Sequence, residues 1–290
     1  MAVLDRLYER ARARQARVVF PELADPRVAE AAARLQAEGL CTPLELSEVS
    51  PAQVATLVEG RGMKEALARR LLTKPLYRAA AMVAAGEAEA MVAGVASPTR
   101  RVIEAAAMAI GLAPGVRLPS SFFLMVFPDG REMIFADCAV NLAPDAEELA
   151  AIATASAASC KALLGPARVA LLSFSTGTSG SGESVDRVRA AARMTGFAGP
   201  VQADAALNPR IAALKGLGRK PGMGDANVLV FPSLDAGNIG YKLAQELARA
   251  QALGPFLQGF ARPVCDLSRG ATTGDIVDAT AVTLALGQPG

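Results

Sequence analysis

The chain has 290 residues, enough for one large or two medium-sized domains. Hydrophobic residues make up 52% and charged residues 20%, which excludes a disordered chain. The formal net charge is +2 and the basic residues are spread along the sequence, which argues against a nucleic-acid-binding surface. Histidine is absent, which excludes every Ser-His-Asp or Cys-His arrangement and leaves acid–base chemistry to Asp, Glu, Lys, Tyr or Cys.

Strands and helices alternate in the first part of the chain, a pattern typical of an α/β fold with a largely parallel sheet. A basic helix at the N-terminus leads into the first strand. Between the second and third strands the spacing of apolar residues indicates two helices. The expected elements are strands at 17–21, 42–46 and 90–94 and helices at 26–40 and 99–111.

The pattern changes near Ala113-Pro114-Gly115, after which two apolar runs flank Pro128-Asp129-Gly130. This arrangement predicts a β-hairpin, and an antiparallel insertion in an α/β chain often marks a new domain. Beyond the hairpin strands at 121–127 and 132–136, we expect helices at 144–164, 183–193, 236–252 and 275–286 and strands at 169–173, 227–231 and 255–260.

The four cysteines lie far apart and form no CxxC pair, which indicates reduced thiols in a cytoplasmic protein and argues against a zinc site. We interpret them as small buried hydrophobic residues. No apolar run reaches the roughly 18 residues of a membrane span, and the N-terminus lacks the apolar core of a signal peptide. We therefore expect a cytoplasmic protein with no bound metal, no membrane association and no nucleic-acid partner.

The segment PVCDLSRGATTGDIVD at 263–278 carries the most chemistry. It places Ser268 and Arg269 before a glycine and Asp275 at the start of a predicted helix. An acid that accepts a proton and a nearby fixed cation that stabilises an oxyanion are what an acyl transfer needs. Two simpler interpretations stay open. Thr272 and Asp275 have the spacing of a capping box, and Arg269 could be a solvated residue in a turn.

Two further loops each follow a predicted strand and lead into a predicted helix. The glycine- and serine-rich loop at 173–182, with Ser175 and Thr176, could bind phosphate through its amides and hydroxyls, or could be a mobile surface loop. In the second loop, Gly237 would let a ligand approach the backbone, and Asn238 offers a hydrogen-bond donor and an acceptor. Alternatively, this loop is only a tight turn between a strand and a helix. Asp137 and Asp204 each stand at the end of a predicted strand. Either could be the N-cap of a helix or an acid of the site.

Taken in order, these segments resemble the phosphate acetyltransferases, which exchange an acetyl group between coenzyme A and inorganic phosphate. The resemblance implies two α/β domains with a cleft between them, a fold related to the isocitrate and isopropylmalate dehydrogenases, and a homodimer. The first domain would comprise 1–115 and 250–290, and the second 116–249. The matching segments are FADCAVN at 135–141, LLSFST at 171–176, QADAALNPRIA at 202–212, ANVLVFPSLDAGNIGYKLAQ at 226–245 and GPFLQGFARPVCDLSRG at 254–270.

Carried over residue by residue, the resemblance implies that Asp275 deprotonates the coenzyme A thiol, that Arg269 binds the phosphoryl group and that Ser268 orients the reacting groups. The thiolate would attack acetyl phosphate directly in a ternary complex. Coenzyme A and acetyl-CoA are then substrates, and no cofactor is permanently bound. An ordinary Asp has a pKa of about 3.9 and a thiol about 8.5, so this proton transfer is uphill by about 6 kcal/mol. We expect burial of Asp275 and stabilisation of the thiolate and oxyanion to recover that energy.

The sequence departs from the family pattern at one helix, where Glu104 stands in the place of an arginine. Arg100 and Arg101 lie one helical turn earlier, and we expect one of them to reach the same position. A second family arginine, near Arg61, has no clear counterpart.

Other functions are compatible with the resemblance. A longer-chain phosphate acyltransferase would use the same site. A non-catalytic acetyl-CoA-sensing module would keep the fold, although the chain stands alone and retains Ser268, Arg269 and Asp275. A metal- and NAD-dependent decarboxylating dehydrogenase would need a carboxylate cluster and a dinucleotide-binding loop, and the sequence shows neither.

Overall fold

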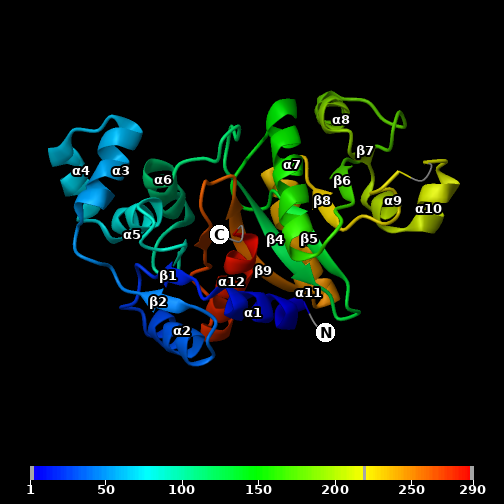
Figure 1. Ribbon diagram of the computed structural model, residues 1–290. Helices are drawn as coiled ribbons and strands as arrows, with labels where there is room; N and C mark the ends of the chain where they lie inside the picture. Colours follow the sequence, from blue (N-terminus) through cyan, green and yellow to red (C-terminus); the bar gives the residue numbers. More distant parts are fainter. Residues whose placement is uncertain (1–2, 218–219, 288–290) are drawn as a thin grey trace. The chain divides into compact units, whose positions relative to one another are not determined.

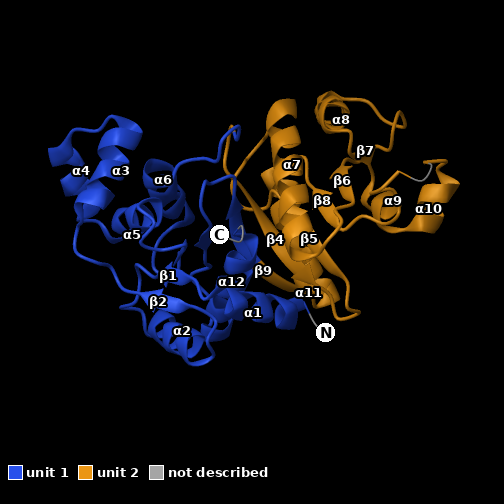
Figure 2. Ribbon diagram, in the orientation of Figure 1, with its two compact units in different colours: residues 1–116, 254–290 blue, residues 117–253 orange. Residues whose placement is uncertain are grey.

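The computed structural model describes residues 3–217 and 220–287. The chain forms two compact units, one of residues 1–116 and 254–290 and the other of residues 117–253 (Figure 2). Both combine helices with a largely parallel sheet, so the prediction of an α/β protein is confirmed. The division into two domains at 115/116 and 249/250 remains a proposal from the resemblance.

The first unit contains the strand order β2-β1-β3-β10-β9, of which residues 251–253 of β9 belong to the second unit. Neighbouring strands from β2 to β10 run parallel, and β9 pairs antiparallel with β10. All residues of β3 and β10 are buried. Because β1, β3 and β10 are adjacent and parallel, the residues that follow their carboxyl ends lie at one edge of the sheet. The strands span Arg17–Val19 (β1), Thr42–Leu44 (β2), Ala90–Ala93 (β3), Gln251–Gln258 (β9) and Val264–Asp266 (β10).

Three helices, not the predicted two, connect β2 and β3. Gly62 ends α3 in the left-handed conformation, and Pro75 begins α5, so that a short separate helix, α4, lies between them. The last helix, α12, packs against α1 and α2 and is buried along most of its length (Figure 1). The helices of this unit span Val3–Arg14 (α1), Pro26–Ala37 (α2), Pro51–Arg61 (α3), Glu65–Leu72 (α4), Pro75–Ala84 (α5), Thr99–Ala109 (α6) and Thr273–Leu286 (α12).

The second unit contains the strand order β4-β5-β8-β6-β7. The predicted hairpin is confirmed, since β4 and β5 pair antiparallel around Pro128-Asp129-Gly130, and the other neighbours are parallel. The strands span Ser120–Val126 (β4), Glu132–Ala136 (β5), Val169–Leu172 (β6), Ala198–Val201 (β7) and Val228–Val230 (β8); the helices span Ala146–Leu163 (α7), Glu183–Thr195 (α8), Ala203–Leu207 (α9), Pro209–Leu214 (α10) and Leu234–Ala248 (α11).

Aromatic and sulfur-containing side chains from β4 and β5 form the core of the second unit together with residues of β6, β8 and α9. Tyr241 of α11 stacks on Phe123 of β4 with ring centroids 4.1 Å apart, which fixes this helix on the sheet. Within the described ranges, no helix is both long and apolar enough to cross a membrane.

Candidate active site

The loop between β10 and α12, together with the first turn of α12, carries the predicted catalytic residues. The amide of Ala271 donates to the carbonyl of Ser268 at 2.9 Å, which closes a turn, and the amide of Gly270 donates to the Ser268 hydroxyl at 3.2 Å. The side chains of Ser268 and Arg269 are exposed. The predicted Gly-containing turn is therefore confirmed, and it presents both side chains to solvent.

Asp275 forms the predicted capping box with Thr272. Its Oδ2 accepts from the Thr272 amide at 2.9 Å and from the Thr272 hydroxyl at 2.8 Å, and its own amide donates back to that hydroxyl at 3.2 Å. No group in the described part of the chain donates to Oδ1. Asp275 is exposed, so the expectation that it is buried is wrong for this structure. The Oδ1 atom remains available to an incoming proton donor.

Arg27, which the sequence analysis did not single out, holds this loop from α2. Its Nη1 donates to the carbonyls of Arg269 and Ala271, both at 2.9 Å. Its Nε and Nη2 bind the carboxylate of Asp25, the N-cap of α2, at 3.0 and 2.8 Å. The sequence Asp25-Pro26 signals the start of a helix, but nothing in it indicates the loop that Arg27 contacts.

A second group that sequence reasoning missed lies at the carboxyl ends of β1, β3 and β10. Asp266 is 1% exposed, and neither carboxyl oxygen has a hydrogen-bond partner among the described residues. The pKa of Asp266 is raised to about 7, chiefly by burial and to a smaller extent by the negative charge of Glu22, while the nearby Thr99 hydroxyl opposes the shift without reaching hydrogen-bond geometry. Asp266 therefore favours its neutral form far more than an exposed aspartate does.

Glycine at position 94 makes room for this acid. Gly94 has a φ of +115°, and a Cβ placed there would come within 2.6 Å of Asp266 Oδ1. Its amide and that of Val95 donate to Glu22 Oε2 at 2.9 and 2.8 Å. Two carboxyl groups thus lie against the same glycine.

Arg100 and Arg101 are both paired with Glu104 on α6. The distances are 2.9 Å from Arg100 Nε to Oε1 and 3.0 Å from Arg101 Nη1 to Oε2, and the arginine side chains are 88% and 63% exposed. These pairs lower the pKa of Glu104. Arg61 instead donates to the carbonyls of Ala107 and Met108 at the end of the same helix. That Arg100 or Arg101 binds substrate stays a prediction.

In the second unit, the hydroxyls of the glycine- and serine-rich loop are bonded within the chain. Ser175, 1% exposed, lies 3.2 Å from the Ser179 hydroxyl. The Thr176 hydroxyl donates to the side chain of Gln202 and accepts from its amide, both at 3.1 Å. Lys215 reaches the same Gln202 side-chain oxygen at 2.8 Å. The loop is ordered by these bonds, and phosphate binding by Ser175 and Thr176 stays a prediction.

The small size of Gly237 serves packing against the chain itself. A Cβ there would lie 2.2 Å from the carbonyl oxygen of Asp137. The side-chain Nδ2 of Asn238 donates to the Cys138 carbonyl at 3.2 Å. Asp137 is buried and accepts from Ser121, Asn141 and loop amides, while Asp204 pairs with Lys215 at 3.2 Å. The structure thus accounts for all four residues within the fold, and ligand contacts of Gly237 and Asn238 stay predictions.

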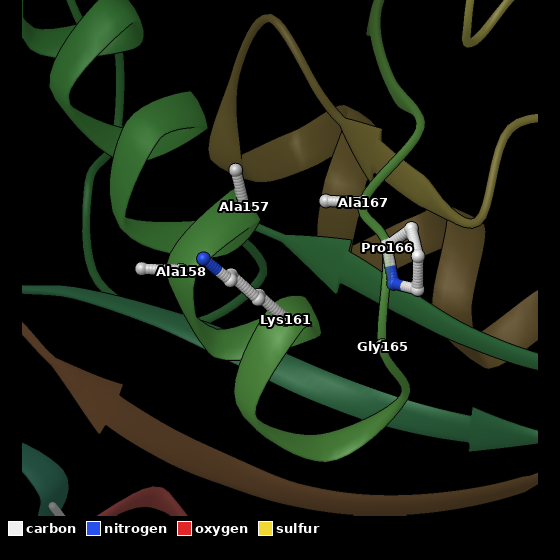
Figure 3. A pocket seen from close by; sticks show the side chains of 6 residues that line it. All are labelled: Ala157, Ala158, Lys161, Gly165, Pro166 and Ala167. Carbon is white, nitrogen blue, oxygen red and sulfur yellow. The ribbon is translucent and has the colours of Figure 1, made fainter.

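The four cysteines are free and buried, and burial raises the pKa of each, that of Cys265 to about 12, so none is suited to act as a nucleophile. Across residues 3–217 and 220–287, no group of three or more His, Cys, Asp or Glu residues could hold a metal ion. A largely apolar pocket of about 570 Å³ lies beside Lys161 and Pro166, between the end of α7 and the segment before β6 (Figure 3). It contains none of the predicted site residues.

Comparison with known proteins identifies the family. Residues 2–54 and 45–284 match the model of a family described as phosphate acetyl/butaryl transferase. The chain belongs to this family. A phosphate acetyltransferase of Paracoccus denitrificans is 42% identical over 98% of both chains, and one of Thermoanaerobacterium thermosaccharolyticum is 39% identical over the same shares.

Solved structures of this phosphate acyltransferase family share the fold. A phosphotransacetylase from Streptococcus pyogenes, 34% identical, superposes with a TM-score of 0.91 over 98% of this chain and 97% of the other. One from Staphylococcus aureus, 35% identical, gives 0.89 over 97% and 98%. The resemblance found from the sequence segments is therefore confirmed over nearly the whole chain.

Proposed function

We propose that this protein is a phosphate acetyltransferase that interconverts acetyl-CoA plus phosphate with acetyl phosphate plus coenzyme A. The observation that carries the proposal is the near full-length identity with proteins of that name. The site supports it, because Ser268 and Arg269 lie in the loop before α12 and Asp275 in the first turn of that helix, with all three side chains exposed. Coenzyme A, acetyl phosphate and phosphate are the substrates that this activity implies.

In the proposed reaction, Asp275 Oδ1 accepts the thiol proton of coenzyme A. The thiolate forms a bond to the carbonyl carbon of acetyl phosphate, the bond from that carbon to the phosphate oxygen breaks, and the phosphate leaves and takes up the proton that Asp275 held. The guanidinium of Arg269 offers a planar pair of donors to the phosphoryl oxygens, and the Ser268 hydroxyl orients the reacting groups.

The energetics require help from Arg269. The transfer of a proton from a thiol to an ordinary aspartate is uphill by about 6 kcal/mol. A well-aimed donor at a developing negative charge contributes about 3 to 4 kcal/mol. Bound substrates would have to exclude water from the loop to provide the rest, because electrostatic interactions strengthen when water is displaced.

We further propose that the protein is a cytoplasmic homodimer. Three side chains on one face of α11 are exposed and apolar, at Ile239 (57%), Leu243 (52%) and Leu247 (80%). They lie four residues apart, so they form a stripe along the helix, and such a stripe is typical of a face that a second subunit covers. The four free cysteines support the cytoplasmic assignment.

The decisive experiment measures thioester formation from acetyl phosphate and coenzyme A in the wild type and in Asp275→Asn. If Asp275 is the base, the amide cannot accept the proton, and turnover should fall by about 10²- to 10⁴-fold with little change in coenzyme A affinity. If it is only a capping residue, stability should fall by about 1 kcal/mol or less with normal turnover.

Glu148→Gln is the matched control, because Glu148 is the corresponding acid of the capping box of α7 and has no proposed role in the reaction. It should leave turnover unchanged. A wild type that binds acetyl-CoA but forms no thioester would favour the sensing module, and a preference for butyryl phosphate would indicate a longer-chain acyltransferase.

A further inference from the structure

Arg27 makes an unusual connection between the start of α2 and the loop that carries Ser268 and Arg269. One guanidinium nitrogen donates to two main-chain carbonyls, those of Arg269 and Ala271, each at 2.9 Å. No backbone amide of the described residues donates to either carbonyl. The hydrogen-bonding needs of this loop are thus met by a side chain from a distant part of the sequence.

Arg27 is itself held in place before it reaches the loop. Asp25 accepts from its Nε at 3.0 Å and its Nη2 at 2.8 Å, and the same carboxylate accepts the Arg27 amide at 2.9 Å as the N-cap of α2. This pairing raises the pKa of Arg27 and lowers that of Asp25. A guanidinium fixed in this fork geometry loses little further freedom when it binds the carbonyls.

A second contact from the same helix acts on the other end of the loop. The Thr273 hydroxyl donates to Glu30 at 2.9 Å, one turn along α2 from Arg27. The loop from Arg269 to Thr273 is therefore attached to α2 at both ends, in addition to the turn bonds of Ser268 and the capping-box bonds of Thr272.

We propose that Arg27 is a positioning residue for acyl transfer, which fixes the main chain at Arg269 and Ala271 and thereby directs the Arg269 guanidinium. The proposal rests on the function proposed above. Arg27 itself need not touch substrate, since four of its five N–H donors are used by the chain. Its contribution is orientation. A mutation far from the reacting atoms that misplaces a reacting group by about 1 Å can lower a rate by about 10²-fold.

The test compares Arg27→Ala with Arg34→Ala in the thioester assay. Arg34 lies on the same helix and, among the residues that the structure describes, forms an ion pair only with Glu38, at 2.6 Å, so it controls for the loss of a charge from α2. We expect Arg27→Ala to lower kcat by about ten- to hundredfold with less than about a threefold change in the KM for coenzyme A. Arg34→Ala should behave as the wild type.

A double variant separates positioning from general destabilisation. If Arg27 acts through Arg269, adding Arg27→Ala to Arg269→Ala should lower kcat by less than about twofold, because the group that it positions is already gone. An equal proportional loss in both backgrounds would overturn the proposal. So would wild-type kcat in Arg27→Ala.

Should Arg27→Ala fail to fold, Arg27→Lys carries the same test. Lysine keeps the charge but cannot bind Asp25 in a fork while reaching two carbonyls, so kcat should still fall at least about fivefold. Full activity of a folded Arg27→Lys protein would overturn the proposal. If the wild type itself forms no thioester, the proposed function fails first, and that result is distinct from an active wild type that tolerates Arg27→Ala.

Discussion

Replacement of Asp266 by Asn should make the protein more stable above about pH 4, by an amount that grows with pH up to about pH 7. Asp266 is 1% exposed, its carboxyl oxygens have no partner in the described part of the chain, and its pKa is raised from 3.8 to about 7. Between pH 3.8 and about 7, the carboxyl group of Asp266 is therefore protonated in the folded state and ionised in the unfolded state. Wild-type unfolding free energy should fall as pH rises through that window and stay low above it.

The size of the effect follows from the pKa difference of about 3 units. Each unit corresponds to about 1.36 kcal/mol, so the charged form of Asp266 costs at most about 4 kcal/mol above pH 7 and about 2 kcal/mol near pH 5.5. Asparagine has nearly the same shape and does not ionise. Asp266→Asn should thus match the wild type near pH 4 and exceed its stability increasingly up to pH 7, with a constant difference above.

Urea unfolding followed by far-ultraviolet circular dichroism measures this difference, since the chain contains no tryptophan. Asp204→Asn is the control, because the pKa of Asp204 is lowered by Lys215 and its removal should bring no gain at any pH. A difference between Asp266→Asn and the wild type that does not vary between pH 4 and 8 would refute the reasoning. A variant that is less stable than the wild type at pH 8 would show instead that Asp266 is ionised and favourably paired.

Three further predictions concern the proposed site and assembly. Arg269→Lys should be nearly as damaging to turnover as Arg269→Ala, because a point charge does not reproduce two parallel donors, and full activity in the Lys variant would show that charge alone matters. Arg100→Ala or Arg101→Ala should raise the KM for coenzyme A or acetyl phosphate, and wild-type kinetics in both would end the idea that either replaces the missing arginine. Leu243→Glu should shift the protein from dimer to monomer in light scattering after size-exclusion chromatography, whereas a monomeric wild type would contradict the proposed dimer.

Features that depend on neighbouring residues could be predicted from the sequence alone. The capping box of Thr272 and Asp275 and the hairpin at Pro128-Asp129-Gly130 were both predicted correctly, because side chains and backbone groups a few residues apart form them. The third helix between β2 and β3 was missed, since α4 spans only Glu65–Leu72 and no side chain caps its start. The family itself was recognisable because long segments matched in order.

Features that depend on residues far apart in the chain required the tertiary structure. The packing of Gly237 against Asp137 and the contact of Arg27 with the Arg269 carbonyl join segments about 100 and 242 residues apart, and no local pattern encodes either partner. The pKa of Asp266 is set by burial and by Glu22, and neither is visible in the residues around it. The sequence by itself determined most of the elements, the family and the candidate residues, but not α4, α9, α10 or β10. The tertiary structure decided which of those residues are exposed, what holds them and which acid is buried, because these properties arise only when the sheet brings distant strand ends together.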